Sequence, residues 1–476
     1  MNTPDPPTLT DSRGLGGVIA QDGFDFQLWY ALSRVPIWLS NPAFEGVILE
    51  GLEDVEARFF AAHADHYRLL ERYQVKSGAL TPAAVREVFE EFQRFERHYP
   101  RTARVQALIS ASLPSTLRWL ARDTARVCAA RPFYAPFSDI ARASDARLLA
   151  DLQETFGTDL GRFVAESVEV SELLIANREI AFGTFSAAFG ATFPQLEEVS
   201  QKSLRRVFDD LCRFAEHNRG TLMQRAALLA PIEQEIGKPL LSATFPLHVR
   251  SDRNESNERA LEIDASEFSG ADGQFPSPAH WRTGLVMPLD ATARWLRQHQ
   301  VTRVALTGSY RLTTGLVLGW SLRSAIGFEI EIGTRSGVWL TDDRPQTDQP
   351  QPAWRLIEAQ VLDGDRLRVC VGVLRDPLPA VVHAHDISPA TILSLMLDQP
   401  ISSGHVTQAS VAAIKNAVVA TVSRLKPAHI ALYFAGPASL AVALGHRWNS
   451  LPPTQLHEFR AAQGDYVATA LIGALP

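Results

Sequence analysis

Apolar and polar residues follow a strand pattern in two short segments near the N-terminus of the chain. The first segment spans residues 45–60 and contains Asp54, and the second, residues 73–76, reads Tyr-Gln-Val-Lys. Because successive side chains of a strand point to opposite faces, Gln74 and Lys76 share one face while Tyr and Val pack on the other. The pattern therefore predicts neighbouring strands that bring an Asp and a Gln-x-Lys to one cleft.

Apolar residues recur at helical spacing in two further segments, residues 82–98 and residues 201–220. Thr81 provides an N-cap for the first helix, and Pro82 suits its first turn. Gly220 is the expected stop of the second. The apolar positions are Val85, Val88, Phe89, Phe92 and Phe95 in the first helix, and Leu204, Val207, Phe208, Leu211 and Phe214 in the second.

The C-terminal half contains an internal repeat. A run that begins at Val304 (VALTGSYRLTTGLVLGWSL) aligns without a gap to one that begins 126 residues later at Ile430 (IALYFAGPASLAVALGHRW). Each copy has a strand-like run, a loop of small and polar residues, an apolar helix pattern and another strand-like run. This order predicts two Rossmann-like α/β units.

Polar segments suggest where the chain divides. We place the end of an N-terminal domain with a helical extension at residue 230, which leaves residues 231–476 for a second domain. The Pro-, Gln- and Asp-rich residues 341–354 are typical of a linker, so the second domain divides into residues 231–345 and 354–476. The polar, turn-rich residues 251–278 predict a surface loop.

Composition fits a soluble globular protein, with 46% hydrophobic and 21% charged residues. No run approaches the ~20 apolar residues of a membrane span, and the first residues lack the pattern of a signal peptide, so we expect a cytoplasmic protein without a membrane partner. Cys128, Cys212 and Cys370 are isolated and odd in number, which argues against a disulfide framework or a Cys-based zinc site.

The net charge of −7 argues against a protein that coats nucleic acid over its whole surface. A local basic patch is present, however, because Arg118, Arg122 and Arg126 recur every four residues and so share one helical face. This face is either a DNA-binding surface that follows phosphates or a solvated helix face.

The candidate chemistry of residues 45–76 is phosphodiester hydrolysis, which needs a divalent cation with oxygen ligands, an activated water and a nearby positive charge. Asp54, with Glu50 or Glu53, provides carboxylates for Mg²⁺ or Mn²⁺, and the Gln74 carbonyl is a weaker ligand. Lys76 can orient the water and stabilise charge on the phosphorus. The alternative is a surface hairpin whose polar residues point to solvent.

This segment resembles the catalytic core of the PD-(D/E)xK nuclease superfamily, in the Mrr-like variant where Gln replaces the second acid. Residues 16–35 resemble the first helix of the nuclease domain that is found fused to SAVED domains, and Gly23 and Gln27 match its Gly-x-x-x-Gln pattern. The resemblance implies a restriction-endonuclease-like α/β domain with Gln27 beside the metal and double-stranded DNA as substrate.

The repeated loops of the C-terminal half are candidates for ligand binding. In Rossmann-like units, ligands bind beyond the carboxyl ends of parallel strands, so two related units would bring both loops to one pocket. The alternative is that both are ordinary strand-to-helix turns. Neither loop is a dinucleotide fingerprint or a P-loop. The residues are Thr307, Gly308, Ser309, Tyr310 and Arg311 in the first loop, and Ala435, Gly436, Pro437, Ala438 and Ser439 in the second.

Residues from about 235 to 476 resemble a SAVED domain, a fused pair of CARF-like units, and the match is clearest in HIALYFAGPASLAVALG. The pattern covers Ala435, Gly436, Pro437, Leu440, Ala441, Leu444 and Gly445. SAVED domains sense cyclic oligonucleotides in the bacterial anti-phage systems called CBASS, and a cyclic trinucleotide is the expected activator here.

Together the two resemblances imply a metal-dependent endonuclease that is activated by a cyclic oligonucleotide from a partner cyclase and that forms a homo-oligomer when the ligand binds. Two alternatives stay open. The chain could be an Mrr-like restriction nuclease whose second half recognises modified DNA, or a nucleotide sensor without catalytic activity.

Overall fold

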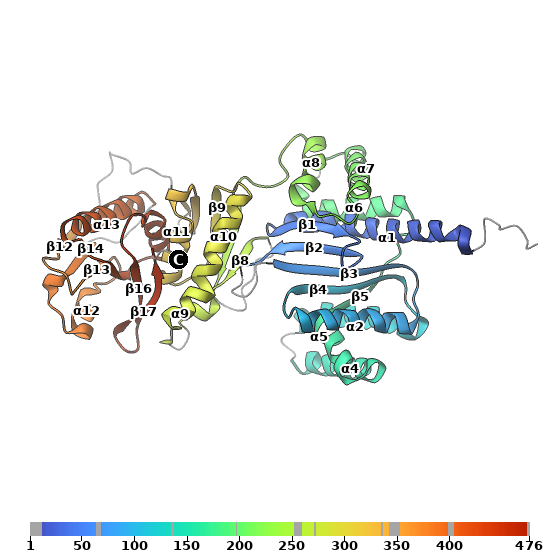
Figure 1. The fold of residues 1–476 in the computed structure, drawn as a ribbon, viewed down its shortest axis with the longest axis horizontal. Helices are drawn as coiled ribbons and strands as arrows, with labels where there is room; N and C mark the ends of the chain where they lie inside the picture. Colours follow the sequence, from blue (N-terminus) through green and yellow to red (C-terminus); the bar gives the residue numbers. More distant parts are fainter. Residues whose placement is uncertain are drawn as a thin grey trace, which may run out of the picture. The chain divides into compact units, whose positions relative to one another are not determined.

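The computed structural model describes residues 12–62, 68–134, 138–196, 198–251, 259–270, 273–334, 337–341, 353–397 and 404–473. The chain forms two compact units, the first ending at Leu241 and the second starting at Ser242 (Figure 1). The first unit extends beyond residue 230, where the sequence placed its end, because helix α8 (Arg225–Ile236) buries Leu228 and Ile232 there. Residues 342–352, most of the expected linker, lie outside the described residues.

A six-stranded mixed sheet forms the centre of the first unit, in the order β5-β4-β3-β2-β1-β6. Strands β1, β2 and β3 are antiparallel neighbours, whereas β4 and β5 run parallel to β3. The strands are β1 (Phe44–Leu49), β2 (Val55–Phe60), β3 (Arg68–Ala79), β4 (Ala103–Ser112), β5 (Val168–Glu172) and β6 (Met223–Gln224). The pattern around Asp54 is therefore two strands joined by a turn, and Asp54 lies at the end of that turn rather than within a strand.

Helices cover both faces of this sheet (Figure 1). On one side lie α1 (Ser12–Ser40), α6 (Arg178–Thr192), α7 (Gln201–His217) and α8; on the other lie α2 (Pro82–His98), α3 (Arg118–Tyr134), α4 (Ser138–Phe156) and α5 (Thr158–Ser167). The two helices predicted from apolar spacing, α2 and α7, are confirmed, and Thr81 caps α2 by accepting a hydrogen bond from the Ala84 amide.

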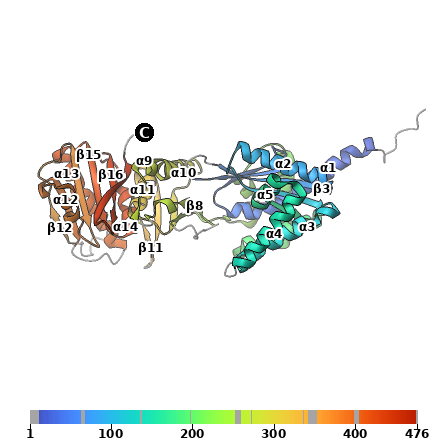
Figure 2. The same cartoon turned by 90° about the horizontal axis from the view of Figure 1, so that it is seen from below.

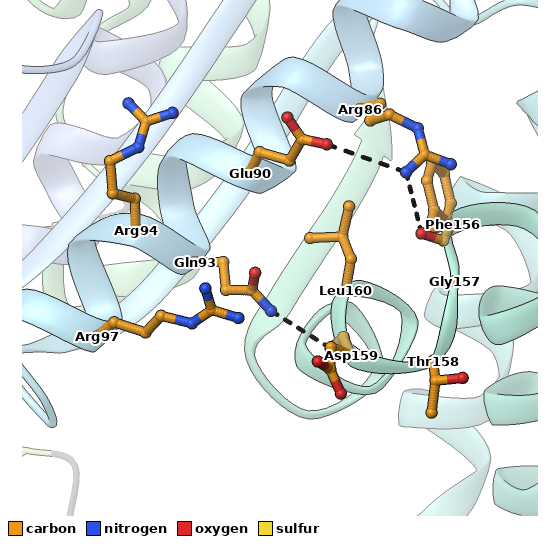
Figure 3. A pocket seen from close by; sticks show the side chains of 10 residues that line it. All are labelled: Arg86, Glu90, Gln93, Arg94, Arg97, Phe156, Gly157, Thr158, Asp159 and Leu160. Atoms are coloured by element: carbon orange, nitrogen blue, oxygen red, sulfur yellow. Dashed lines mark hydrogen bonds and ion pairs between the residues drawn. The ribbon is translucent and has the colours of Figure 1, made fainter.

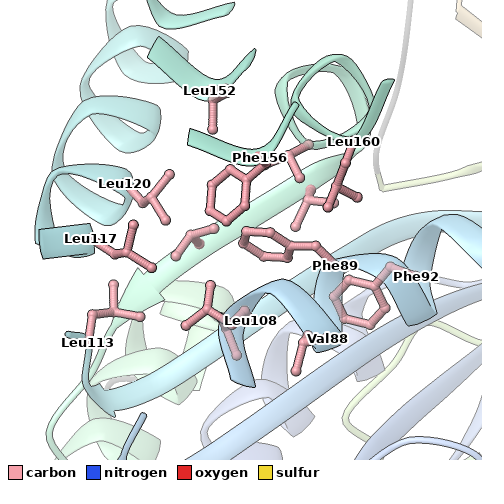
Figure 4. Close-up of a cluster of buried hydrophobic side chains, with 14 of the residues drawn as sticks. Val88, Phe89, Phe92, Leu108, Leu113, Leu117, Leu120, Leu152, Phe156 and Leu160 are labelled. Carbon is pink, nitrogen blue, oxygen red and sulfur yellow. The ribbon is translucent and has the colours of Figure 1, made fainter. Parts of the chain in front are cut away.

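The core between α2 and its neighbouring helices is built from the predicted apolar face of α2. Phe89 and Phe92 are fully buried there, and the ring of Phe89 meets the ring of Phe156 edge to face at 5.2 Å between centroids (Figure 4). Burial of such aromatic side chains contributes about 2–3 kcal/mol each to folding. This packing fixes α2 against the strands that carry the candidate catalytic residues.

The second unit contains two sheets with matching topology, which confirms the internal repeat. Their orders are β11-β10-β9-β7-β8 and β17-β16-β15-β13-β14-β12, with only β12 unmatched. The first sheet comprises β7 (Phe245–Arg250), β8 (Leu261–Asp264), β9 (Arg303–Gly308), β10 (Glu329–Thr334) and β11 (Gly337–Leu340). The second comprises β12 (Trp354–Ile357), β13 (Arg366–Gly372), β14 (Ile392–Leu397), β15 (His429–Ala435), β16 (Thr454–Arg460) and β17 (Asp465–Ile472).

Part of the predicted surface loop at residues 251–278 is instead a buried strand. Leu261 and Ile263 of β8 are buried as β8 pairs in parallel with β7. Only two apolar residues alternate in this short strand, so the polar residues around it dominate the sequence pattern. Residues 252–258 and 271–272 lie outside the described residues.

Two helices related by the repeat pack against each other, and their ends correspond at the same 126-residue offset: α11 (Leu312–Ser321) and α14 (Ala438–Arg447). They lie side by side (Figure 2). A Cβ atom added at Gly319 would lie under 3.0 Å from the carbonyl oxygen of Val442, and one at Gly445 would lie equally close to that of Leu316. The contacts are reciprocal, so a pseudo-twofold axis passes between the helices.

The remaining helices of the second unit are α9 (Pro278–Trp281), α10 (Met287–Gln298), α12 (Leu378–His385) and α13 (Gly404–Leu425). No helix within the described part of the chain is both long and apolar enough to cross a membrane. Cys212 and Cys370 are buried free thiols, and the side chain of Cys128 lies outside the described residues.

Acid is expected to destabilise the second unit through His457, whose ring stacks on Tyr433 at 4.3 Å between centroids. Burial lowers the pKa of His457 from 6.5 to about 4. Between these values the unfolded chain binds a proton that the folded chain does not. Stability is therefore fully present above pH 6.5 and decreases as the pH falls from 6.5 towards 4, by up to about 3 kcal/mol.

Chemical denaturation at pH 7 and pH 5 would measure this loss. His457→Gln, which cannot titrate, is expected to reduce the difference between the two pH values. An unchanged difference in that variant would contradict the assignment to His457.

Candidate active site and candidate ligand-binding loops

The turn between β1 and β2, residues 50–54, places Asp54 beside β3. The Oδ2 atom of Asp54 accepts hydrogen bonds from the backbone amide of Val75 at 2.7 Å and from Nζ of Lys76 at 2.8 Å. Tyr73 is buried on the opposite face, where its ring contacts Tyr30 of α1 at 5.3 Å between centroids. The predicted alternation along β3 is therefore present, and Asp54 and Lys76 meet directly.

Glu53 is the second carboxylate of this cluster. It is buried and accepts hydrogen bonds from the Gln74 side-chain amide and from the Arg72 guanidinium, which also donates to Gln106 Oε1 at 3.1 Å. Burial raises the pKa of Glu53 to about 7, and the opposing effect of the Arg72 charge is smaller.

Glu50, which the sequence offered as a metal ligand, faces elsewhere. Its carboxylate forms an ion pair with Arg219, and 37% of its side chain is exposed. The cause is the local backbone, because Glu50 adopts a left-handed φ of 54° where the chain leaves β1. The turn thus directs Glu53 and Asp54 to β3 and directs Glu50 to the loop after α7.

Arg72 was missed by the sequence reasoning, although a signal was present. It precedes Gln74 by two residues in the same strand, so alternation places both on one face. Its guanidinium lies over the ring of Phe95 at 3.6 Å from the centroid, which connects the catalytic strand to α2. Arg72 therefore balances the buried charge of Glu53.

Gln27 lies on α1, which packs along β3. A Cβ atom added at Gly23 would lie 3.9 Å from Oγ of Ser77, the residue that follows Lys76. The buried carbonyl oxygen of Gln27 has no hydrogen-bond partner within the described part of the chain. Tyr73 and Ser77 of β3 face α1, so by alternation α1 packs on the face of β3 opposite Gln74 and Lys76. A place for Gln27 beside the metal stays a prediction.

The donor set fits Mg²⁺ or Mn²⁺, since the carboxylate of Asp54 and the carbonyl of Gln74 provide hard oxygen atoms. Gln74 uses its amide nitrogen for Glu53, which leaves its carbonyl oxygen for another partner. Within the described ranges, no group of three or more His, Cys, Asp or Glu side chains could hold a metal ion. A cation here therefore depends on the amide of Gln74 and on water.

The three arginines predicted to share one face do so on α3. Arg118, Arg122 and Arg126 are exposed, whereas Leu117 and Leu120 on the other side are buried. Arg122 is paired with Asp123 at 2.6 Å, and Arg118 lies 3.8 Å from Glu172. The helix and its solvated face are as expected, and DNA contact by this face stays a prediction.

The first candidate ligand loop, residues 307–311, follows β9 and leads into α11. Gly308 has a φ of 98°, and a Cβ atom there would collide with the carbonyl oxygen of Val249, so only glycine fits. The carbonyl oxygen of Ser309 accepts a hydrogen bond from Ser251 Oγ at 2.6 Å. Thr307 contacts His248 Nδ1 at 3.1 Å.

Two larger side chains shape this loop. Burial raises the pKa of Tyr310 above its ordinary value. Arg311 donates to the carbonyl oxygen of Ser269 and lies 5.6 Å from the ring centroid of Phe275. The loop is therefore fixed by contacts to neighbouring segments of its own unit.

The second candidate loop, residues 435–439, joins β15 to α14. The carbonyl oxygen of Ala435 accepts a hydrogen bond from the Val373 amide at 2.8 Å. A Cβ atom at Gly436 would press on the ring of Phe434, and Pro437 is the N-cap of α14, which brings Ser439 into its first turn. Both loops thus lie at the carboxyl ends of central parallel strands, as predicted.

The two helix starts differ in one respect that the sequence did not indicate. The amide of Thr313 at the start of α11 donates to the buried carboxylate of Glu458 at 2.7 Å, whereas Pro437, the N-cap residue of α14, makes no side-chain capping hydrogen bond in the described part of the chain. Burial raises the pKa of Glu458. Among the described residues, a buried carboxylate therefore lies at the start of α11 without a counterpart at the start of α14.

Comparisons with known proteins agree with this division. Residues 15–215 match the family model described as the Cap4 dsDNA endonuclease domain. Residues 289–472 match that of the SMODS-associated and fused to various effectors sensor domain, SAVED. Each match lies within one unit of the chain.

Two curated relatives match almost from end to end. Both are called CD-NTase-associated protein 4; the protein from Moraxella osloensis is 23% identical and the one from Acinetobacter sp. 22%, over 97% of this chain and 98% of theirs. The fold is similar to the Acinetobacter baumannii Cap4 SAVED/CARF-domain receptor with 2′3′3′-cAAA (TM-score 0.79, 20% identity, 95% of this chain and 99% of that chain). The Moraxella osloensis Cap4 receptor is also similar (TM-score 0.74, 20% identity, 96% and 100%).

Proposed function

Since the chain joins a Cap4-type dsDNA endonuclease domain to a SAVED sensor domain, we propose that it is a CBASS effector that cleaves double-stranded DNA in the cytoplasm when a cyclic oligonucleotide binds its second unit. The observation that carries this proposal is the contact of Asp54 with Lys76 beside Gln74, in a chain that also has paired loops for a ligand. The nucleotide, made by a partner cyclase, is a cyclic trinucleotide such as those in the related Cap4 structures.

The catalytic roles follow from the contacts. A bound Mg²⁺ or Mn²⁺ supplies an activated water and neutralises charge on the phosphate. Asp54 and the Gln74 carbonyl would hold this cation, and Glu53 fixes the amide of Gln74 through its hydrogen bond. Lys76, with Nζ 2.8 Å from Oδ2 of Asp54, would orient the water and stabilise the negative charge that develops on the phosphate oxygens.

Ligand binding is proposed to favour a homo-oligomer in which nuclease units act together on one duplex. Sedimentation with and without 2′3′3′-cAAA would measure this step. A monomer with saturating ligand and full cleavage activity would contradict oligomerisation while leaving the nuclease assignment intact.

Plasmid cleavage by the purified chain with Mg²⁺ tests the function itself. The reactions contain 2′3′3′-cAAA, 3′3′3′-cAAA, cyclic di- and tetranucleotides, or no nucleotide, and an EDTA control removes the cation. Cleavage with one or a few nucleotides only is the expected result. Cleavage without any nucleotide would instead support a restriction nuclease that recognises modified DNA.

Substitution of the two glutamates is expected to distinguish their roles. Glu53→Gln should lower the cleavage rate about 10-fold or more, because a neutral amide cannot balance Arg72 while holding Gln74 in the same way. Glu50→Gln should leave the rate within about 3-fold, since Glu50 contributes only an exposed ion pair with Arg219. Initial rates over a Mg²⁺ titration measure both, and the reverse order of effects would contradict the assignment of Glu53.

A further inference from the structure

Helix α2 separates two pockets on the surface of the first unit. The smaller, about 490 Å³, lies between α2 and the start of α5 (Figure 3), and the other, about 570 Å³, lies between α2 and the catalytic turn. Arg94 and Arg97 line both pockets. Leu52, two residues before Asp54, is the residue of the turn that lines the second pocket.

Two of the arginines in these pockets, Arg72 and Arg86, already have partners. Arg72 is neutralised by Glu53. Arg86 donates to the carbonyl oxygen of Phe156 at 3.0 Å and lies 3.9 Å from Glu90 (Figure 3). These arginines therefore stabilise the protein itself and are not free for a ligand.

Arg94 and Arg97 differ from them. Both are exposed, and among the described residues neither forms a hydrogen bond or an ion pair. In Figure 3 the side chain of Arg97 extends into the smaller pocket, whereas that of Arg94 points away from its centre. Glu91 is the acidic residue that lines the larger pocket, where His98 adds a further basic group. The smaller pocket contains Asp159, and its Glu90 is paired with Arg86. Arg94 and Arg97 therefore outnumber Glu91 in the larger pocket and Asp159 in the smaller one, so the local charge favours an anion.

Leu52 gives this surface an apolar part. Its side chain is 73% exposed at the tip of the turn that also carries Glu53 and Asp54. A leucine so exposed, beside free guanidinium groups and a catalytic carboxylate, suits a partner with both apolar and phosphate surfaces. The sugars and phosphates of a DNA duplex present this combination.

We propose that Arg94 and Arg97 bind backbone phosphates of the DNA substrate next to the bond that is cleaved, while Leu52 packs against its sugars. This inference rests on the proposed nuclease function and adds to it a substrate-binding surface on α2, distinct from the arginine face of α3. Arginine suits this role because it stays charged and donates several hydrogen bonds to one phosphate.

The test uses the full chain with Lys76→Ala, so that DNA is bound without being cut. Binding of a labelled 30-base-pair duplex is measured by fluorescence anisotropy from 50 to 300 mM NaCl, with and without 2′3′3′-cAAA. Arg94→Ala/Arg97→Ala is expected to raise the Kd about 10-fold at 150 mM NaCl and to reduce the slope of log K against log salt by about 2. Leu52→Ser is expected to raise the Kd about 3-fold without changing the slope.

The matched control is Arg206→Ala/Arg213→Ala, which removes the same charge from exposed positions of α7 on the other side of the sheet and should leave both quantities unchanged. Arg94→Lys/Arg97→Lys, which keeps the charge, should restore most of the slope. An unchanged Kd and slope in the alanine variant, with the duplex bound by the parent, would overturn this inference alone. Absence of duplex binding by the parent would overturn the inference together with the proposed function.

Discussion

Lys76→Ala is expected to lower plasmid cleavage by about 10³-fold while the chain stays folded and still binds its nucleotide. The loss is this large because Lys76 is the cation in contact with Asp54, and removal of one group that stabilises developing charge typically costs a factor of 10²–10³. The fold should tolerate the change, since 34% of the Lys76 side chain is exposed and the Val75 amide still donates to Oδ2 of Asp54.

Cleavage rates, thermal denaturation and nucleotide binding by calorimetry measure the three parts of this prediction. Lys202→Ala on α7, an exposed position, provides a control with the same change of charge. Lys76→Arg should not restore cleavage, because a planar guanidinium places its charge differently from an ammonium group. Normal cleavage by Lys76→Ala would refute the site.

Gly319→Ala is expected to destabilise the second unit by about 3 kcal/mol and to abolish nucleotide-dependent cleavage. The added Cβ atom would overlap the carbonyl oxygen of Val442. Because this atom belongs to the backbone and cannot move aside as a flexible side chain can, α11 and α14 must move apart. Because the contact is reciprocal, Gly445→Ala should have a similar effect through the carbonyl oxygen of Leu316.

The control is Gly183→Ala, the same substitution within helix α6, where an added Cβ atom meets nothing within 4 Å. There the better helix propensity of alanine should raise stability by up to about 1 kcal/mol. Thermal denaturation of the three variants provides the comparison. Equal melting temperatures for Gly319→Ala and the wild type would show that the helices are not held together at this position.

Local patterns predicted much of the fold. Alternation along residues 73–76 correctly separated Gln74 and Lys76 from Tyr73, and the internal repeat predicted two sheets of the same topology. These features succeed because strand alternation and helical spacing act between residues close in sequence. The nuclease and SAVED assignments depended instead on resemblance to known families, and the comparisons confirm them.

The details of the site depended on longer-range geometry. Sequence spacing could not show which of Glu50 and Glu53 points towards β3. Glu50 points away because its own backbone is left-handed and because it pairs with Arg219, which is far away in the chain. The cap that Glu458 provides for α11 likewise joins residues 145 positions apart. Such contacts join residues that are distant in sequence. They depend on how strands and helices pack together, so the pattern within one segment does not predict them.

The carboxylate at the start of α11 has a consequence for the symmetry of the second unit. Two identical subunits around a true twofold axis must present the same side chain on both sides of their shared pocket. Here both halves belong to one polypeptide, and the pairing of β10 with β9 and of β16 with β15 makes Thr334 the first-half equivalent of Glu458. One chain that carries both halves is free of that constraint, so one half has a carboxylate where the other has a hydroxyl. The orientations of a ligand bound between the two proposed loops would then cease to be equivalent.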